Sequence, residues 1–455
     1  MARLALVALV AATLLSACES TAPREPSDKD ILASLPTPGP LSWPARDTTR
    51  VASERNRRAQ LAAEEEARRE ADQREEEDEE DEEDLLSYIE AWYPDESHGG
   101  TGAGGMFEVD DWPGDEKGLD EDELVIVPVP FANPTIGAGL YLIGGYIFRI
   151  DPEEEDAPPS AAGLAGMVST NGSWGVGLGG SFHVDEDRWR ILTALAYADV
   201  NYKLYGIGQQ LGLEGRSVDI SQSVLGLEVD VLRYLGSSMY LGPVFRAFTV
   251  DTDLNKGRPF EFGRFRLNIP TVRTREVSAG LEFTRDTRDD KFYPRRGDHL
   301  DLQARVYSEG LGGDHDYRVY TAAWSLYHSL ANRTVLAGRG YGRLADGDVP
   351  FYALSYLGAG SDIRGYEVGR YQDRILLAFQ AEIRQELAHH FGVEVFGGVG
   401  QVADRMGDFR LNDFLPGVGA GVTYTVTDKS HVNMRADVAW GVDGWVFYLG
   451  VGQAF

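Results

Sequence analysis

The feature that most constrains this chain is a recurring alternation of apolar and polar side chains between residues 124 and 455. It occurs in segments of about ten residues separated by turn-rich clusters, which is typical of strands with two different faces. In residues 376–385 these faces are Leu377, Phe379, Ala381, Ile383 and Gln380, Glu382, Arg384. The second face carries charges of both signs, which favours a wet interior with paired ions over a solvent-facing sheet. We therefore expect an all-β membrane protein with its apolar side chains outward.

Counting the segments indicates how the sheet closes. After Leu15 no apolar run is long enough for a membrane-spanning helix. Closed bacterial barrels have an even number of strands, with short periplasmic turns and longer external loops. The long connections at 202–216, 253–271, 346–374 and 404–415 all fall on the external side. The sequence predicts a 16-stranded antiparallel transmembrane β-barrel in the bacterial outer membrane, in contact with its lipid, with strands at 124–131, 136–149, 161–171, 173–184, 189–201, 217–233, 238–252, 272–286, 298–309, 315–330, 333–345, 375–388, 391–403, 416–427, 431–441 and 444–455.

The N-terminal residues read as an export signal. Arg3 precedes an apolar stretch that is too short to span a bilayer. The stretch ends in Leu15-Ser16-Ala17-Cys18, which resembles the lipobox of bacterial lipoproteins. We expect residues 1–17 to be a lipoprotein-type signal peptide and Cys18, the only cysteine, to be the site of lipid attachment. An ordinary signal peptide cut nearby would instead leave Cys18 as an unused thiol.

The region before the barrel is strongly charged. Residues 18–60 are rich in Pro and polar residues and read as an extended tether. Residues 61–123 read as an acidic helical or disordered arm with a Gly-rich joint, and 15 of the residues in 64–84 are acidic. With a net charge of −30, the chain is not expected to bind nucleic acid. We expect the arm to lie in the periplasm, either to bind a basic partner or to serve as a solvated spacer.

The first and last predicted strands have unusual residues. Pro128 and Pro130 each remove a donor from the first strand, so its seam with the last strand would lose hydrogen bonds. Such a seam could open sideways into lipid, or the strand could be a short edge that never pairs fully. The last strand ends in Phe455, and a terminal aromatic residue resembles the C-terminal sorting signal of outer-membrane barrels.

Two motifs carry a resemblance to a known superfamily. Residues 283–297 contain Arg285, Asp286, Arg288, Asp289, Pro294 and Gly297, in the connection between the predicted eighth and ninth strands. Residues 356–366 contain Ile363-Arg364-Gly365-Tyr366, in the long loop between the eleventh and twelfth strands. Together they resemble the outer-membrane assembly and surface-antigen superfamily of β-barrels, which includes the BamA and TamA families and the two-partner-secretion transporters.

The resemblance implies a role for the loop motif. In this superfamily the loop folds into the lumen, where its arginine meets carboxylates of strands twelve and thirteen. Carried over by position, Arg364 is the loop arginine and Glu382 the carboxylate of strand twelve. Gly398 stands where strand thirteen usually has Asp, and Glu394 has the same facing parity. The alternative is that Arg364 is a solvent-exposed loop residue.

The resemblance also implies a function in outer-membrane biogenesis, either protein insertion or lipid movement through a weak seam between the first and last strands. Outer-membrane proteins are the clients it suggests. Residues 19–123 do not show the strand pattern of the POTRA domains that usually accompany client handling. A surface-displayed binding barrel and a passive pore remain alternatives. The sequence offers no recognisable catalytic, metal or phosphate-binding motif, so we expect neither an enzyme nor a cofactor.

Overall fold

The computed structural model describes the chain from residue 123 onward. The described ranges are 123–150, 158–215, 217–254, 260–262, 265–267, 271–291, 293–358, 362–387, 390–425 and 433–455. The expected signal peptide, Cys18, the tether and the acidic arm lie outside them. Within these ranges no helix combines the length and the apolar character needed to cross a membrane.

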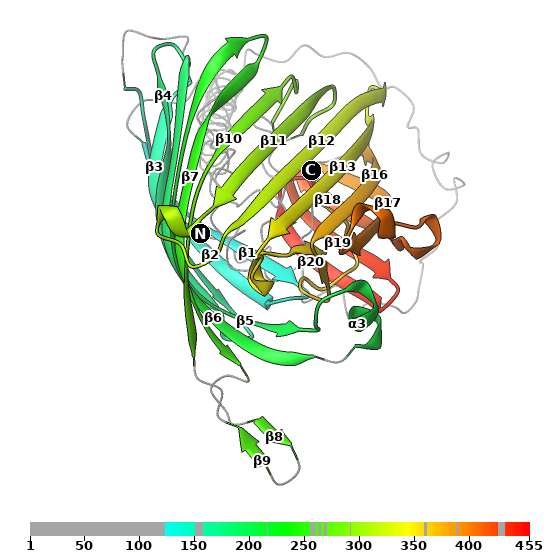
Figure 1. Ribbon diagram of the computed structural model, residues 1–455. Helices are drawn as coiled ribbons and strands as arrows, with labels where there is room; N and C mark the ends of the chain where they lie inside the picture. Colours follow the sequence, from blue (N-terminus) through cyan, green and yellow to red (C-terminus); the bar gives the residue numbers. More distant parts are fainter. Residues whose placement is uncertain are drawn as a thin grey trace, which may run out of the picture. The chain divides into compact units, whose positions relative to one another are not determined.

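Sixteen antiparallel strands form one closed barrel, which confirms the predicted fold class (Figure 1). In barrel order they are β1 (Glu123–Asn133), β2 (Gly137–Phe148), β3 (Ser160–Ser169), β4 (Trp174–Val184), β5 (Trp189–Leu204), β6 (Val218–Gly236), β7 (Met239–Leu254), β10 (Val272–Asp286), β11 (Gly297–Tyr307), β12 (Tyr317–Ala331), β13 (Thr334–Gly347), β16 (Ile375–Glu386), β17 (Phe391–Ala403), β18 (Leu415–Thr425), β19 (Asn433–Gly441) and β20 (Gly444–Val451).

The remaining elements lie in the connections. Two small sheets are β8 (Phe260–Phe262) with β9 (Phe265–Leu267), and β14 (Ser355–Leu357) with β15 (Tyr371–Asp373). The helices among the described residues are α3 (Gln209–Glu214), η5 (Glu309–Leu311), η6 (Phe351–Ala353), η7 (Met406–Asp408) and η8 (Leu411–Asp413). The turns after β4, β6, β12 and β16 are short and lie at one end of the barrel, here called the turn end. The long connections after β5, β7, β13 and β17 lie at the other end, here called the loop end.

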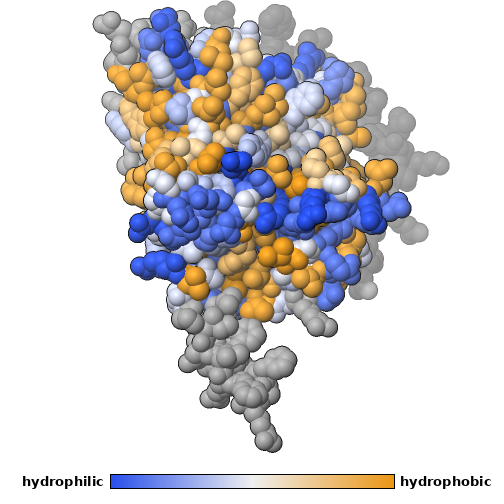
Figure 2. Space-filling view, in the orientation of Figure 1, coloured by the Kyte–Doolittle hydropathy of each residue, from blue (hydrophilic) through white to orange (hydrophobic). Residues whose placement is uncertain are grey.

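The apolar and polar residues that alternate in the sequence lie on the outer and inner faces of the barrel wall. On β16, Phe379 and Ile383 are half exposed on the outside, whereas Gln380, Glu382 and Arg384 are buried inside. Apolar outer side chains can contact lipid, and inward charges can pair with one another. On the face that Figure 2 shows, hydrophobic residues lie above and below a hydrophilic band. This band lies at about the same height as the segment that follows β17 in Figure 1.

The ladders between strands differ greatly in length. All 16 residues of β5 pair with β6, and all 11 residues of β1 pair with β2, including Pro128 and Pro130. By contrast β1 pairs with β20 at a single position, Ala132 with Leu449. The β1–β20 contact, which we call the seam, therefore has far fewer backbone pairs than the β5–β6 ladder.

The last strand is shorter than the sequence predicts. A strand was expected over 444–455, but β20 ends at Val451. Gly452 has a φ of 82° and turns the chain out of the ladder. Phe455 is buried against Tyr327 of β12 and Ala337 of β13, so an apolar contact replaces strand pairing for the final residues.

Candidate functional site

The connection between β13 and β16, residues 348–374, forms a loop that we call the lumen loop. Its β14–β15 hairpin brings Ile363, Arg364 and Tyr366 into the barrel, where each is 1% exposed. The Asp362 carboxylate accepts the backbone N–H groups of Gly358 (2.9 Å) and Ile363 (2.7 Å). Gly365 has a φ of 114°, a conformation that side chains disfavour. These local features direct Arg364 toward the strands instead of toward solvent.

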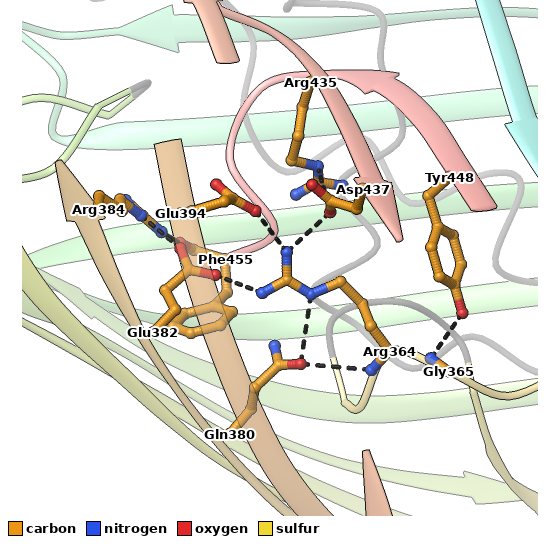
Figure 3. A network of polar contacts seen from close by, with 10 residues as sticks. All are labelled: Arg364, Gly365, Gln380, Glu382, Arg384, Glu394, Arg435, Asp437, Tyr448 and Phe455. Atoms are coloured by element: carbon orange, nitrogen blue, oxygen red, sulfur yellow. Dashed lines mark hydrogen bonds and ion pairs between the residues drawn. The ribbon is translucent and has the colours of Figure 1, made fainter. Parts of the chain in front are cut away.

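The Arg364 guanidinium contacts three carboxylates from three strands (Figure 3). Its Nη1 donates to Glu394 of β17 at 2.7 Å and to Asp437 of β19 at 2.8 Å. Its Nη2 donates to Glu382 of β16. The loop arginine thus links β16, β17 and β19 from inside the barrel.

A second layer of contacts fixes this arrangement. The Gln380 side-chain oxygen accepts the Arg364 backbone N–H at 3.3 Å, and the guanidinium lies 3.3 Å from the centre of the Phe396 ring. Arg384 donates to Glu382 at 2.5 Å, and Arg435 pairs with Asp437 at 3.2 Å. We call the six charged residues Arg364, Arg384, Arg435, Glu382, Glu394 and Asp437 the arginine cluster.

The arginine cluster holds equal numbers of basic and acidic groups, each of them buried. Removing one partner would leave a buried charge unpaired, at a cost of about 3–5 kcal/mol. Burial alone would lower the pKa of Arg364, but the carboxylates outweigh it and raise that pKa above its ordinary value. Arg364 is therefore held as a cation, and the cluster acts as a polar clamp between loop and wall.

Glycines in the wall make room for this clamp. Gly421 of β18 lies in register between Glu394 and Asp437, and a Cβ there would fall 2.0 Å from Asp437 Oδ1. A Cβ at Gly417 would fall 2.4 Å from the Arg364 carbonyl oxygen, and one at Gly441 2.5 Å from the Gly365 carbonyl oxygen. The loop can approach the strands only where these side chains are absent.

The lumen loop also contacts the strand at the seam. The Gly365 backbone N–H donates to the Tyr448 hydroxyl of β20 at 2.9 Å. The Tyr366 hydroxyl donates to the Pro416 carbonyl oxygen at 2.6 Å. Beyond β20, Arg384 Nη2 donates to a main-chain oxygen of Phe455 at 2.7 Å. The arginine cluster and its neighbours thus reach a strand that has one backbone pair with β1.

The turn motif lies apart from the arginine cluster, between β10 and β11. Arg285 pairs with Asp298 across the turn at 3.1 Å, whereas Arg288 pairs with Asp286 beside it at 2.8 Å. Asp289 accepts the backbone N–H groups of the two residues after Pro294, at 2.9 and 3.0 Å. Gly297 has a φ of 102°, which suits a residue without a side chain. The motif organises the backbone of this turn.

Sequence reasoning missed several of these residues. Asp437 is buried in the lumen, but nothing in the local pattern indicated that it meets Arg364, 73 positions earlier. The contact of Tyr448 with the loop could not be predicted either, because its partner is the backbone N–H of Gly365. A chain of hydrogen bonds through Ser181, His183 and Asp187 was also missed. Among the described residues no group of three or more His, Cys, Asp or Glu side chains could hold a metal ion.

Comparisons with known proteins place this geometry in a family. The model of the Omp85 superfamily domain matches residues 215–455. Over 92 residues the chain is 36% identical to the outer membrane protein assembly factor BamA of Nitratidesulfovibrio vulgaris, a match that covers 19% of this chain and 12% of that protein.

One solved structure shares the fold, and a second gives a weaker match. BamA from Haemophilus ducreyi lacking POTRA domains 1–3 matches with a TM-score of 0.53 and 12% identity, over 73% of this chain and 71% of that one. CdiB from Acinetobacter baumannii matches with a TM-score of 0.49 and 11% identity, over 73% and 60%. The closed 16-stranded barrel and the family match over more than half of the chain lead to one conclusion: this chain is an outer-membrane β-barrel of the Omp85 superfamily.

Proposed function

We propose that this barrel assists outer-membrane biogenesis by letting a substrate pass sideways between its lumen and the lipid through the β1–β20 seam. The single backbone pair of the seam carries the proposal. A backbone hydrogen bond contributes about 1 kcal/mol net, so a nearly unpaired seam opens at a far lower cost than any complete ladder. The substrate is an outer-membrane protein or a lipid.

In this proposal the lumen loop keeps the seam closed when no substrate is present. Arg364 fixes the loop to Glu382, Glu394 and Asp437, and Gly365 contacts Tyr448 of the seam strand. A seam that lacks a ladder needs support from side chains, and these contacts supply it from within. Pro128 and Pro130 help to keep the seam unpaired, because a proline has no N–H to donate.

Two further parts of the chain complete the proposal. Lipid on Cys18 would anchor residues 18–60 to the membrane, and the acidic residues of 61–123 would bind a basic periplasmic partner. The relative in Nitratidesulfovibrio vulgaris is named as an assembly factor, which supports protein insertion as the first substrate class to test. Phe455 would serve as the signal that directs this barrel to the outer membrane.

A cross-link across the seam tests the proposal. Ala132 and Leu449 lie opposite each other at the one seam pair, so replacing both by cysteine allows a disulfide across the seam. Leu195 and Leu227 lie opposite each other within the β5–β6 ladder, and replacing them by cysteine gives the control disulfide. We expect the seam disulfide to reproduce the loss of outer-membrane proteins or lipids caused by depletion of the protein, and reduction to reverse it. The ladder disulfide should have no effect. Normal membrane composition with a fully formed seam disulfide would refute the proposal.

A further inference from the structure

A second polar arrangement lies far from the arginine cluster, at the turn end of β4. Ser181 Oγ lies 3.3 Å from His183 Nε2, and His183 Nδ1 lies 2.7 Å from Asp187 Oδ1. Ser181 and His183 are two residues apart on β4, so both side chains face the lumen. Both are buried, with exposures of 5% and 7%. The three side chains form a serine–histidine–aspartate chain in the order that nucleophile activation requires.

The turn between β4 and β5 holds the aspartate in place at a conformational cost. Asp185, Glu186 and Asp187 have φ values of 59°, 54° and 60°, three successive left-handed residues without a glycine. Each such residue costs about 1 kcal/mol or more, so the surrounding contacts must maintain the turn. Arg190 Nη2 and the Tyr240 hydroxyl each donate to Asp187 Oδ2 at 2.6 Å. The turn thus folds the Asp187 carboxylate back onto His183.

The direction of the hydrogen bonds follows from the charge of Asp187. Burial raises its pKa, but the bonds from His183 and Arg190 outweigh burial, and the pKa lies well below the usual range. An ionised carboxylate can only accept, so His183 Nδ1 carries the proton that it donates. In the neutral ring Nε2 is then the acceptor, and it faces the Ser181 hydroxyl. The backbone N–H of His183 donates to Ser160 Oγ at 2.9 Å, which fixes the residue further.

The residues that flank Ser181 in the two ladders are apolar. Ala161 of β3 and Leu192 of β5 lie directly opposite it in the two ladders. In the next inward-facing row, Gly179 lies opposite Gly163 and Ala194. This row of small and apolar side chains offers contact to a hydrocarbon chain beside the charged Asp187–Arg190 pair.

We propose that Ser181 is an activated nucleophile that reacts with acyl esters entering from the turn end of the barrel, a property separate from the proposed function of the seam. The Ser181 oxygen forms a bond to the ester carbonyl carbon while His183 Nε2 takes the hydroxyl proton. The bond between that carbon and the alcohol oxygen then breaks, and His183 returns the proton to the departing alcohol. Water repeats the two steps, releases the acid and restores Ser181.

Labelling of the full-length, detergent-folded chain by an alkyl fluorophosphonate tests this proposal. Such a probe forms an oxygen–phosphorus bond with an activated serine and releases fluoride. We expect mass spectrometry to find the label on Ser181, and we expect Ser181→Ala to abolish it. His183→Gln should slow labelling by about 100-fold or more, the usual share of a general base. Asp187→Asn should slow it as well, and the same variants should lose hydrolysis of a medium-chain p-nitrophenyl ester.

The matched control is Ser325→Ala, which removes a buried serine whose oxygen accepts a hydrogen bond from Arg339 at 2.8 Å, whereas the Ser181 hydroxyl donates to a histidine. Its labelling rate should equal that of the wild type. The proposal fails if the wild-type chain takes up no label, or if the label lies on any residue other than Ser181. It also fails if His183→Gln and Asp187→Asn label at the wild-type rate. Because the site of labelling is measured on the wild-type chain, the test remains decisive even if a variant misfolds.

Discussion

The β5–β6 wall and the β1–β20 seam close the same barrel in different ways. In the wall, 16 consecutive residue pairs form the contact, from Trp189–Arg233 to Leu204–Val218. In the seam one pair, Ala132–Leu449, forms the contact, although β1 and β20 keep full ladders to β2 and β19. Lumen side chains contact β19 and β20 from inside the barrel. A ladder spreads its stability over many equivalent bonds, whereas a side-chain clamp concentrates it in a few residues. Single substitutions should therefore affect the seam much more than the wall.

The largest effect is expected from Arg364→Glu. The change removes the only lumen-loop cation of the arginine cluster and adds a fourth carboxylate among buried ones, so we expect a loss of at least about 5 kcal/mol in unfolding free energy. The free energy is measured by urea unfolding in detergent, and heat-dependent gel migration checks independently how firmly each variant stays folded. Arg405→Glu is the control, because the Arg405 side chain is 81% exposed. Equal stability of the two variants would show that Arg364 does not clamp the loop.

The clamp should also weaken as the pH rises through about 6. Burial raises the pKa of Asp362 to about 6, although the N–H groups of Ile363 and Gly358 oppose that shift. A folded-state pKa above the unfolded value means that the carboxyl contributes stability at low pH and loses it as the pH rises through the folded pKa. Relative to Asp362→Asn, the wild type should lose up to about 3 kcal/mol between about pH 4 and about pH 7.5. A pH-independent difference between the two proteins would contradict this.

Filling the space behind the loop should have a smaller effect. A Cβ at Gly417 would fall 2.4 Å from the Arg364 carbonyl oxygen, whereas nothing lies within 4 Å of a Cβ at Gly407. We expect Gly417→Ala to cost about 1–3 kcal/mol, as overpacking usually does. Gly407→Ala should leave the urea midpoint unchanged. If both substitutions are neutral, the loop does not need the close approach to β18.

The smallest effect is expected from Tyr448→Phe. It removes the acceptor of the Gly365 backbone N–H and should cost about 1 kcal/mol. The control is Tyr424→Phe on β18, where the ring is 42% exposed on the outer face. A limited-proteolysis assay of the lumen loop would detect loosening that global unfolding overlooks. Unchanged cleavage in Tyr448→Phe would show that this contact does not hold the loop.

The sequence predicts the wall far better than the clamp. Alternation within β16 assigns Phe379 to the outer face and Glu382 to the inner face, because lipid favours apolar side chains and the lumen favours polar ones. Each residue of a strand carries this signal by itself, so it can be read from the local sequence. The strand count follows from the same signal. The resemblance of the loop motif predicts that Arg364 meets Glu382, and side-chain parity adds Glu394 as a candidate partner.

Other features depend on the fold of distant segments. Asp437 meets Arg364 because Gly421 leaves space between β17 and β19, and no local pattern carries that relation. The end of β20 at Val451 depends on a burial site for Phe455 provided by β12 and β13. The Ser181–His183–Asp187 chain depends on three left-handed residues in one turn, which no glycine marks.

Hydrogen exchange of backbone amides tests the central claim, that the lumen loop and not a β1–β20 ladder holds the seam closed. In the wild type the amides of β20 should exchange faster than those of β6, and Arg364→Glu should accelerate β20 further while it leaves β6 unchanged. Equal protection of the two strands in the wild type, or an equal response of both to Arg364→Glu, would contradict that claim.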